Sequence, residues 1–166
     1  MVRKLCVVAI AIAAFFAFQV PTASADEVST CDAYYSGPYT IYIGTNADNT
    51  HYGSDAKDCM FGKGGHDVLL GDDDRDRLSG GDMSDTLQGG LATDFIEGNN
   101  GDDFIYGGGG ADSLWGNAGN DTIDLGDDTA SDVVIGGDGF DEACNWNPGD
   151  AASSDTEYVH AGPCFI

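Results

Sequence analysis

Carboxylates recur at a fixed interval along most of this chain. An aspartate stands at every ninth residue from Asp58 to Asp121, and the unit before Asp58 holds Asn49 at the same position. Side chains that return at constant spacing line up when the residues between them form one structural repeat. Lined-up carboxylates repel one another unless cations neutralise them, so this spacing indicates cation binding. The column contains Asp58, Asp67, Asp76, Asp85, Asp94, Asp103, Asp112 and Asp121, followed after a short insertion by Asp132 and then by Asp141.

Glycines accompany these aspartates. Each of nine successive nine-residue units, the first starting at Gly44, begins with glycine, and glycine is frequent at the second and fourth positions. Glycine permits backbone conformations that a Cβ would forbid, which brings backbone carbonyls close together. Carbonyls and a carboxylate form an all-oxygen shell that suits Ca²⁺, whereas Mg²⁺ prefers small octahedral sites. The turn glycines that we expect to contribute are Gly62, Gly64, Gly80, Gly98, Gly107 and Gly116.

The element that must position these residues is a very short strand. The eighth residue of the unit is apolar in eight of the nine units, and His51 is the exception. One inward aliphatic residue flanked by two outward ones predicts a strand of about three residues, which is stable only when stacked in register about 4.8 Å from its neighbours. After Asp124, the eleven-residue unit 125–135 restores the frame with Val134 in the apolar column. The chain therefore predicts an all-β fold, with a solenoid over residues 44–144.

The pattern resembles the RTX (repeats-in-toxin) family, whose consensus is Gly-Gly-x-Gly-x-Asp-x-aliphatic-x. The resemblance implies a right-handed parallel β-roll in which each calcium ion is held between turns of successive coils by turn carbonyls and sixth-position aspartates. Alternate units would share a side. One stack would hold Asp67, Asp85, Asp103 and Asp121, the other Asp58, Asp76, Asp94 and Asp112, and Asp132 and Asp141 would close the series. Asp74, Met83 and Ala92 depart from the consensus at the fourth position, where a Cβ is costly if φ is positive.

Segments without the repeat flank it on both sides. Residues 1–25 have a basic start at Arg3 and Lys4, an apolar run and the sequence Ala23-Ser24-Ala25, which predicts a cleaved secretory signal peptide. The mature chain would begin at Asp26, contain no membrane span and be extracellular. Residues 26–43, with a β-prone stretch at 39–43, are expected to form an N-terminal cap. Residues 145–166 are expected to form a short, irregular C-terminal cap.

Four cysteines remain after the predicted cleavage. In an oxidising compartment an even set favours disulfides, and four cysteines allow three pairings. Two lie before or at the front of the repeats and two at the back, so we favour Cys31 with Cys59 and Cys144 with Cys164. Zinc is the competing interpretation, but the intervals match no compact ligand pattern.

The net charge of −23 argues against nucleic acid as a partner. A flexible acidic linker would have the composition but not the aliphatic column, and a calcium-free solenoid with an outward threonine face is disfavoured because the seventh position is mixed. The histidines His51, His66 and His160 stand in no catalytic motif, so we expect no enzyme. The sequence thus predicts a secreted protein that binds several calcium ions and folds as it does so. Its task would be a structural or interaction role, with an unidentified cell-surface or matrix partner; the alternative is an accessory or degenerate remnant of an RTX exoenzyme or toxin.

Overall fold

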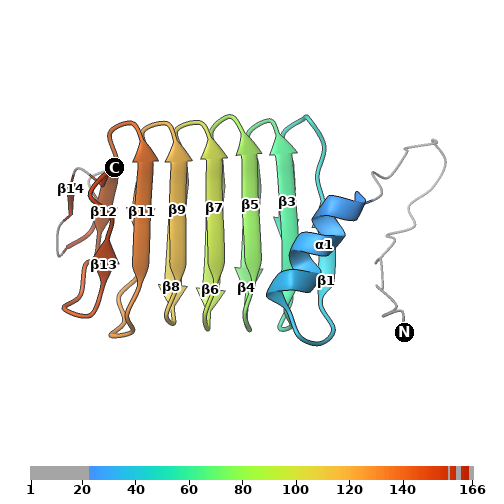
Figure 1. The fold of residues 1–166 in the computed structure, drawn as a ribbon, viewed down its shortest axis with the longest axis horizontal. Coiled ribbons are helices and arrows are strands. Elements are labelled where there is room, and N and C mark those ends of the chain that lie inside the picture. Colours follow the sequence, from blue (N-terminus) through green and yellow to red (C-terminus); the bar gives the residue numbers. More distant parts are fainter. Residues whose placement is uncertain (1–22, 157, 160–161, 165–166) are drawn as a thin grey trace.

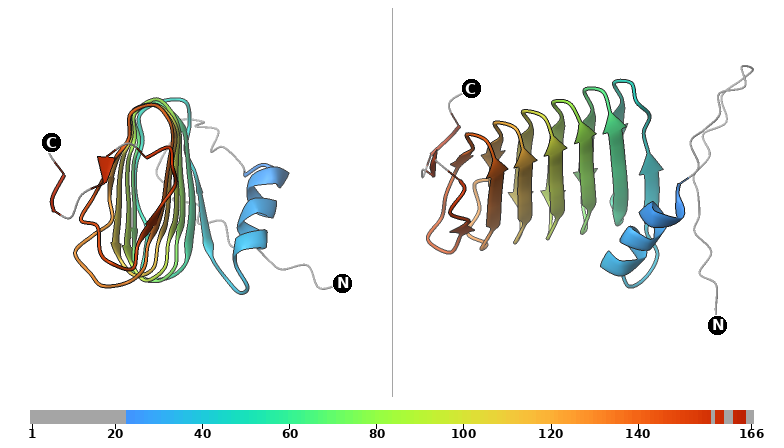
Figure 2. Two further views of the ribbon diagram at one scale, coloured as in Figure 1. Left: turned by 60° about the vertical axis from the view of Figure 1, so that its left-hand side comes forward. Right: turned by 45° about the horizontal axis from the view of Figure 1, so that its top comes forward.

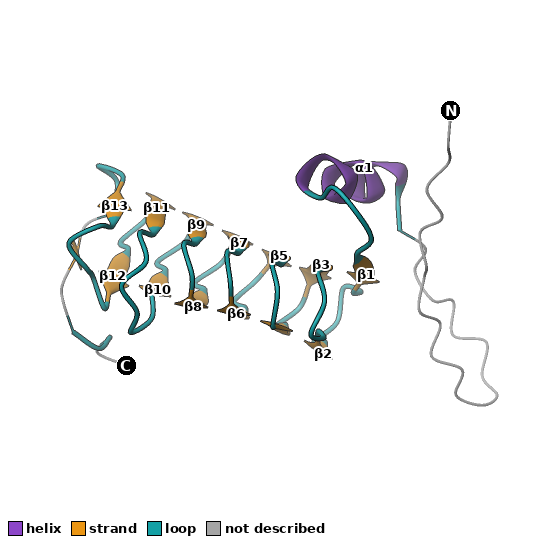
Figure 3. Cartoon of the chain, turned by 90° about the horizontal axis from the view of Figure 1, so that it is seen from below, coloured by secondary structure: helices purple, strands orange, loops and turns teal. Residues whose placement is uncertain are grey.

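The computed structural model describes residues 23–156, 158–159 and 162–164. Two seven-stranded parallel sheets lie face to face, and the chain passes from one to the other at every turn (Figure 1). Seen from below, the strands form two layers joined by turns that zigzag between them (Figure 3). This arrangement confirms the predicted all-β, parallel β-solenoid.

Each sheet collects alternate strands in sequence order, β1-β3-β5-β7-β9-β11-β13 in the first and β2-β4-β6-β8-β10-β12-β14 in the second. The first sheet contains β1 (Thr40–Ile43), β3 (Asp58–Gly64), β5 (Arg77–Asp82), β7 (Phe95–Asn100), β9 (Ser113–Ala118), β11 (Val133–Asp138) and β13 (Ala151–Ala152). The second contains β2 (Thr50–Tyr52), β4 (Val68–Asp72), β6 (Thr86–Leu91), β8 (Phe104–Gly109), β10 (Thr122–Asp124), β12 (Glu142–Cys144) and β14 (Tyr158–Val159).

Two facing files of aliphatic side chains, one on each sheet, form the core. Leu78 pairs with Ile96, which is one coil and two repeat units further along the chain, and this register places every eighth-position residue beside the one two units before it on the same sheet. Leu125, the first residue of the eleven-residue unit, also enters this core. The file on the first sheet consists of Met60, Leu78, Ile96, Leu114 and Val134, and the file on the second sheet consists of Leu69, Leu87, Ile105, Ile123 and Ala143.

Strands β2, β10 and β12 have the predicted three residues, whereas most of the others are longer. Strand β5 runs from Arg77 to Asp82, past the first-position Gly80 and into the next unit. Gly80 is not among the residues with positive φ, so it continues the extended backbone, and pairing resumes beyond it between Gly81 and Asn99. The bend therefore begins at the second position of the unit, where Gly81 has a φ of 129°.

The solenoid also extends beyond residues 44–144 at both ends. Strand β1 pairs with β3, and β13 and β14 pair with β11 and β12, so residues assigned to the caps add to the sheets. At the N-terminal end of the core, the rings of Tyr42 and His51 stack with centroids 3.7 Å apart. Trp146 packs against the core at the opposite end. These ring systems close the aliphatic core where no further coil covers it.

A helix that the sequence analysis did not predict precedes the roll. Helix α1 (Ala25–Tyr34) lies against the outer face of the first sheet rather than over its end (Figure 2). Ser24 accepts a hydrogen bond from the backbone of Glu27, whose side chain accepts one from the backbone of Ser24. This reciprocal capping was readable as Ser-x-x-Glu in the sequence. Residues 1–22, which hold most of the predicted signal peptide, lie outside the described residues.

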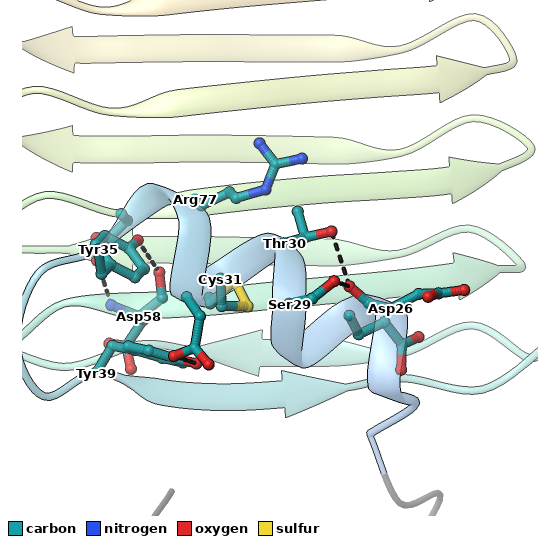
Figure 4. Close-up of a disulfide and its surroundings, with 12 residues drawn as sticks. Asp26, Ser29, Thr30, Cys31, Tyr35, Tyr39, Asp58 and Arg77 are labelled. Atoms are coloured by element: carbon teal, nitrogen blue, oxygen red, sulfur yellow. Dashed lines mark hydrogen bonds between the residues drawn. A yellow bond between two sulfur atoms is a disulfide. The ribbon is translucent and has the colours of Figure 1, made fainter. Parts of the chain in front are cut away.

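Two disulfides fasten the ends in the predicted pairing. Cys31 of α1 is bonded to Cys59 of β3, with their Cα atoms 6.2 Å apart (Figure 4). Cys144 of β12 is bonded to Cys164, with their Cα atoms 5.3 Å apart. Among the described residues, no helix has the length and apolar character needed to cross a membrane.

Candidate calcium sites

The predicted aspartates form two rows along the roll. The turns that follow the first sheet, at the top of Figure 1, carry the upper row, and those at the bottom carry the lower row. Every member is at most 4% exposed, because the side chains point into the turns rather than into solvent. The upper row is Asp67, Asp85, Asp103, Asp121 and Asp141; the lower row is Asp58, Asp76, Asp94, Asp112 and Asp132.

A hydrogen-bond ladder links the aspartates within each row. The backbone amide of Asp85 donates to Oδ1 of Asp103 at 2.8 Å, and that of Asp94 donates to Oδ1 of Asp112 at the same distance. The ladder runs through the eleven-residue unit, since Asp112 donates to Oδ1 of Asp132 at 2.8 Å. Each carboxylate thus uses one oxygen to hold the preceding coil at a fixed spacing.

The lower row has one member that sequence reasoning missed. The amide of Asp132 donates to Oδ1 of Asp150 at 3.0 Å, so Asp150 occupies the next rung. It stands 18 residues after Asp132, two repeat units further along. That spacing was a usable signal, although the units around it have lost the other columns.

The second carboxylate oxygen is different. In eight aspartates Oδ2 is buried and has no hydrogen-bond partner in the structure. A buried carboxylate oxygen without a donor is costly, and such a group is normally compensated by a cation or a proton. The eight are Asp67, Asp85, Asp103 and Asp121 in the upper row and Asp76, Asp94, Asp112 and Asp132 in the lower row.

Backbone oxygens converge on these unpaired atoms. A methyl group added to Gly62 would lie closer than 3.0 Å to both Oδ2 of Asp67 and the carbonyl oxygen of Gly80, one coil further along. First-position glycine is therefore required by close packing, and not by the positive φ that we expected. Gly80, Gly98, Gly107 and Gly116 have the same neighbours in their own units. Gly64 does not, because its nearest such contacts are 3.7 Å or longer.

Burial and mutual repulsion disfavour the charged form of the aspartates in both rows when no cation is bound. Burial, reinforced by neighbouring aspartates and partly opposed by the backbone amide, raises the pKa of Asp76, Asp94 and Asp103 to about 8. The same causes raise the pKa of Asp112 to about 7 and that of Asp85 to about 6. A bound divalent cation would supply the charge that these oxygens lack, and the oxygen-only surroundings favour a hard cation such as Ca²⁺.

The fourth-position departures adopt the same turn as glycine. Asp74, Met83 and Ala92 have φ values of 63°, 77° and 72°. Left-handed backbone costs a residue with a Cβ roughly 1–2 kcal/mol, so these turns are strained as the sequence predicted. The aspartates that follow them, Asp76 and Asp85 among them, are nevertheless buried like the others.

One predicted ligand stands apart. Oδ2 of Asp58 accepts hydrogen bonds from the backbone amide and the hydroxyl of Ser54, at 2.8 and 3.0 Å. Asp58 therefore lacks the unpaired oxygen that marks the eight aspartates further along the rows.

Fold and site together define a β-roll with two rows of candidate calcium sites in its turns. The family model of the RTX calcium-binding nonapeptide repeat (four copies) matches residues 43–69, 52–87, 70–104, 79–114 and 97–130. These overlapping stretches cover residues 43–130, more than half of the chain. The chain belongs to this family of RTX calcium-binding repeat proteins. A search of curated proteins finds no significant match.

Proposed function

We propose that this protein is a secreted structural module in which calcium bound between successive turns drives folding of the roll. The observation that carries the proposal is the set of eight buried, unpaired Oδ2 atoms, seven of which approach the same glycine as a backbone carbonyl of the next coil. Asp67, Asp76, Asp85, Asp94, Asp103, Asp112, Asp121 and Asp132 would provide carboxylate ligands, and backbone carbonyls of the glycine turns would provide the others.

The narrow core and the two aspartate rows explain why calcium binding would be coupled to folding. Because the core is narrow, its apolar burial offsets little of the conformational entropy of the chain. Without cations the rows add carboxylate repulsion to that cost. Calcium that binds the folded state but not the unfolded chain adds its binding free energy to the stability of the fold. Extracellular calcium sites bind the ion at concentrations of about 0.1–1 mM, so this stabilisation is available outside the cell.

A calcium titration tests this mechanism. The oxidised protein would be stripped with chelator and then followed by far-ultraviolet circular dichroism and calorimetry, with magnesium as the control cation. We expect a cooperative gain of β-structure with several calcium ions bound, and little response to magnesium. A circular dichroism spectrum that is the same in chelator and in millimolar calcium would contradict the proposal.

Secretion is supported by the pattern of residues 1–25 and by the two disulfides. N-terminal sequencing of the protein recovered from culture medium tests it, and the expected first residue is Asp26. Retention of the whole chain inside the cell would contradict it. For the interaction role, calcium-loaded protein should retain a cell-surface or matrix component that the chelated protein releases.

A further inference from the structure

The first coil differs from all later ones at the point where calcium is expected. In the turn before β3, Asp58 receives hydrogen bonds from Ser54 and also one from the side chain of Thr40. In the turn before β2, Oδ1 of Asn49 accepts from the backbone amide of Thr45 at 2.7 Å. In both turns, the side-chain oxygen that could otherwise bind a cation already accepts hydrogen bonds from the protein. No orphaned carboxylate oxygen is present at either of these two turns.

The backbone of these two turns is different as well. From Lys63 to Asn117, every second-position residue has a positive φ, and the fourth-position residues from Gly65 to Gly119 do too. Thr45 and Ser54 at the second position, and Ala47 and Ala56 at the fourth, are not among the positive-φ residues. A hydroxyl residue at the second position replaces the left-handed turn with one that closes on its own side chain.

Helix α1 is fastened to the first coil and also contacts the second. Besides the disulfide to Cys59, the hydroxyl of Tyr35 donates to the carbonyl oxygen of Asp58 at 2.6 Å (Figure 4). The guanidinium of Arg75 lies 5.0 Å from the ring centroid of Tyr34 and donates to the Tyr34 carbonyl oxygen at 3.3 Å. Lys63 forms an ion pair with Glu27.

The basic residues are concentrated in this part of the protein. Beyond the predicted signal peptide, the chain has only Lys57, Lys63, Arg75 and Arg77, and no lysine or arginine follows Arg77. Arg77 pairs with Glu97 at 2.6 Å and stacks over Phe95. The first two coils thus carry their own counter-charges, whereas the later coils must obtain theirs from solution.

We infer that residues 26–61 form a calcium-independent cap on which the rest of the roll is assembled, and that the calcium sites begin with Asp67 and Asp76. This inference rests on the proposed function but adds a direction to it. In chelator the cap stays folded while the coils beyond it open, and calcium then orders the roll outward from a preformed first coil.

The far end of the lower row is closed in a similar way. Oδ2 of Asp150 accepts from the backbone amide of Asn147 at 2.5 Å, so this terminal carboxylate is also held by its own turn. It has no helix beside it among the described residues, and no lysine or arginine follows Arg77 in the sequence. The C-terminal turn therefore ends the ion row with a donor from the protein itself, as Ser54 does at the other end.

Hydrogen exchange of the oxidised protein in chelator tests the cap directly. We expect slow exchange for amides of β1 and of residues 58–61, and exchange at the rate of an unfolded chain for amides of β7 to β12. Calcium should then slow the second group by at least about 100-fold and the first group little. If both groups exchange equally fast in chelator and calcium slows both, the cap would be overturned but the proposed function would stand. Exchange that calcium changes nowhere would overturn the proposed function.

A matched pair of variants tests the assignment of sites. Asp58→Asn and Asp94→Asn alter two buried aspartates of the same row. Asp94→Asn should bind at least one calcium ion fewer than the parent protein by calorimetry, whereas Asp58→Asn should bind the same number. Loss of an ion in Asp58→Asn would overturn the assignment. Ser54→Ala is a second variant at this turn, and it should bind the full number of ions while its residues 58–61 exchange faster in chelator.

Discussion

The backbone amide of Asp76 donates a hydrogen bond to Oδ1 of Asp94 at 2.7 Å, and the two residues are one coil apart. The carboxylate of Asp94 therefore has two tasks. Its Oδ1 holds the preceding coil, and its buried Oδ2 has no protein donor. Repeated along both rows, this division of labour ties the spacing of the coils to the cations between them.

Removing one carboxylate charge should weaken the calcium-induced transition. In Asp103→Asn, the side-chain oxygen that remains can still accept the hydrogen bond from the backbone amide of Asp85. The unpaired Oδ2 is replaced by an uncharged NH2 group, so the site loses a ligand atom and a negative charge. We expect the calcium concentration at the midpoint of the circular dichroism transition to rise several-fold. Asp138→Asn is the control, because Asp138 lies at the exposed end of β11. Equal midpoints for the two variants would contradict the assignment of Asp103.

Adding a methyl group beside a carboxylate should disable a site without removing any ligand. In Gly98→Ala the new Cβ would lie closer than 3.0 Å to Oδ2 of Asp103 and to the carbonyl of Gly116. Such overpacking costs about 1–3 kcal/mol, so we expect a lower melting temperature in calcium. Gly109→Ala is the matched control, since its nearest contact would be 3.5 Å. A control variant that loses as much stability would show that close approach is not the cause.

Restoring glycine at a strained position should stabilise the roll. Met83 has a φ of 77°, which costs about 1–2 kcal/mol for a residue with a Cβ, while the added freedom of glycine in the unfolded chain takes back about 0.5–1 kcal/mol. Met83→Gly should therefore raise the melting temperature in calcium by a few degrees. Ala56→Gly, at the same repeat position but without positive φ, should lower it. The opposite order would contradict the strain at Met83.

The ion-free roll should lose stability as pH rises. Burial raises the pKa of Asp76, Asp94 and Asp103 from 3.8 to about 8, so between these values the folded protein binds more protons than the unfolded chain. Stability in chelator is then highest near pH 4 and falls up to about pH 8. Because calcium competes with these protons, its transition midpoint should fall over the same range. Far-ultraviolet circular dichroism in chelator from pH 4 to pH 8 measures the first effect, because the ion-free roll is expected to gain β-structure as the pH falls. A chelated roll that is more stable at pH 8 than at pH 5 would contradict it.

The sequence by itself determined the solenoid, its two rows of aspartates and its narrow core of eighth-position residues. Each coil contacts only the coils before and after it, so a residue's neighbours are set by the nine-residue period alone. Leu78 meets Ile96, and Asp76 meets Asp94, because each pair is two units apart. Even the strain at Met83 could be read from its place in the unit.

Only the tertiary structure decided what happens where the period weakens. That Ser54 satisfies Asp58, that Asp150 adds a rung and that α1 lies on the side of the roll depend on atoms with no periodic counterpart. The first-position glycines show the same limit within the repeats. Their column was plain in the sequence, but the reason for it is the approach of a carboxylate and of the next coil's carbonyl, which exists only once the coils are stacked.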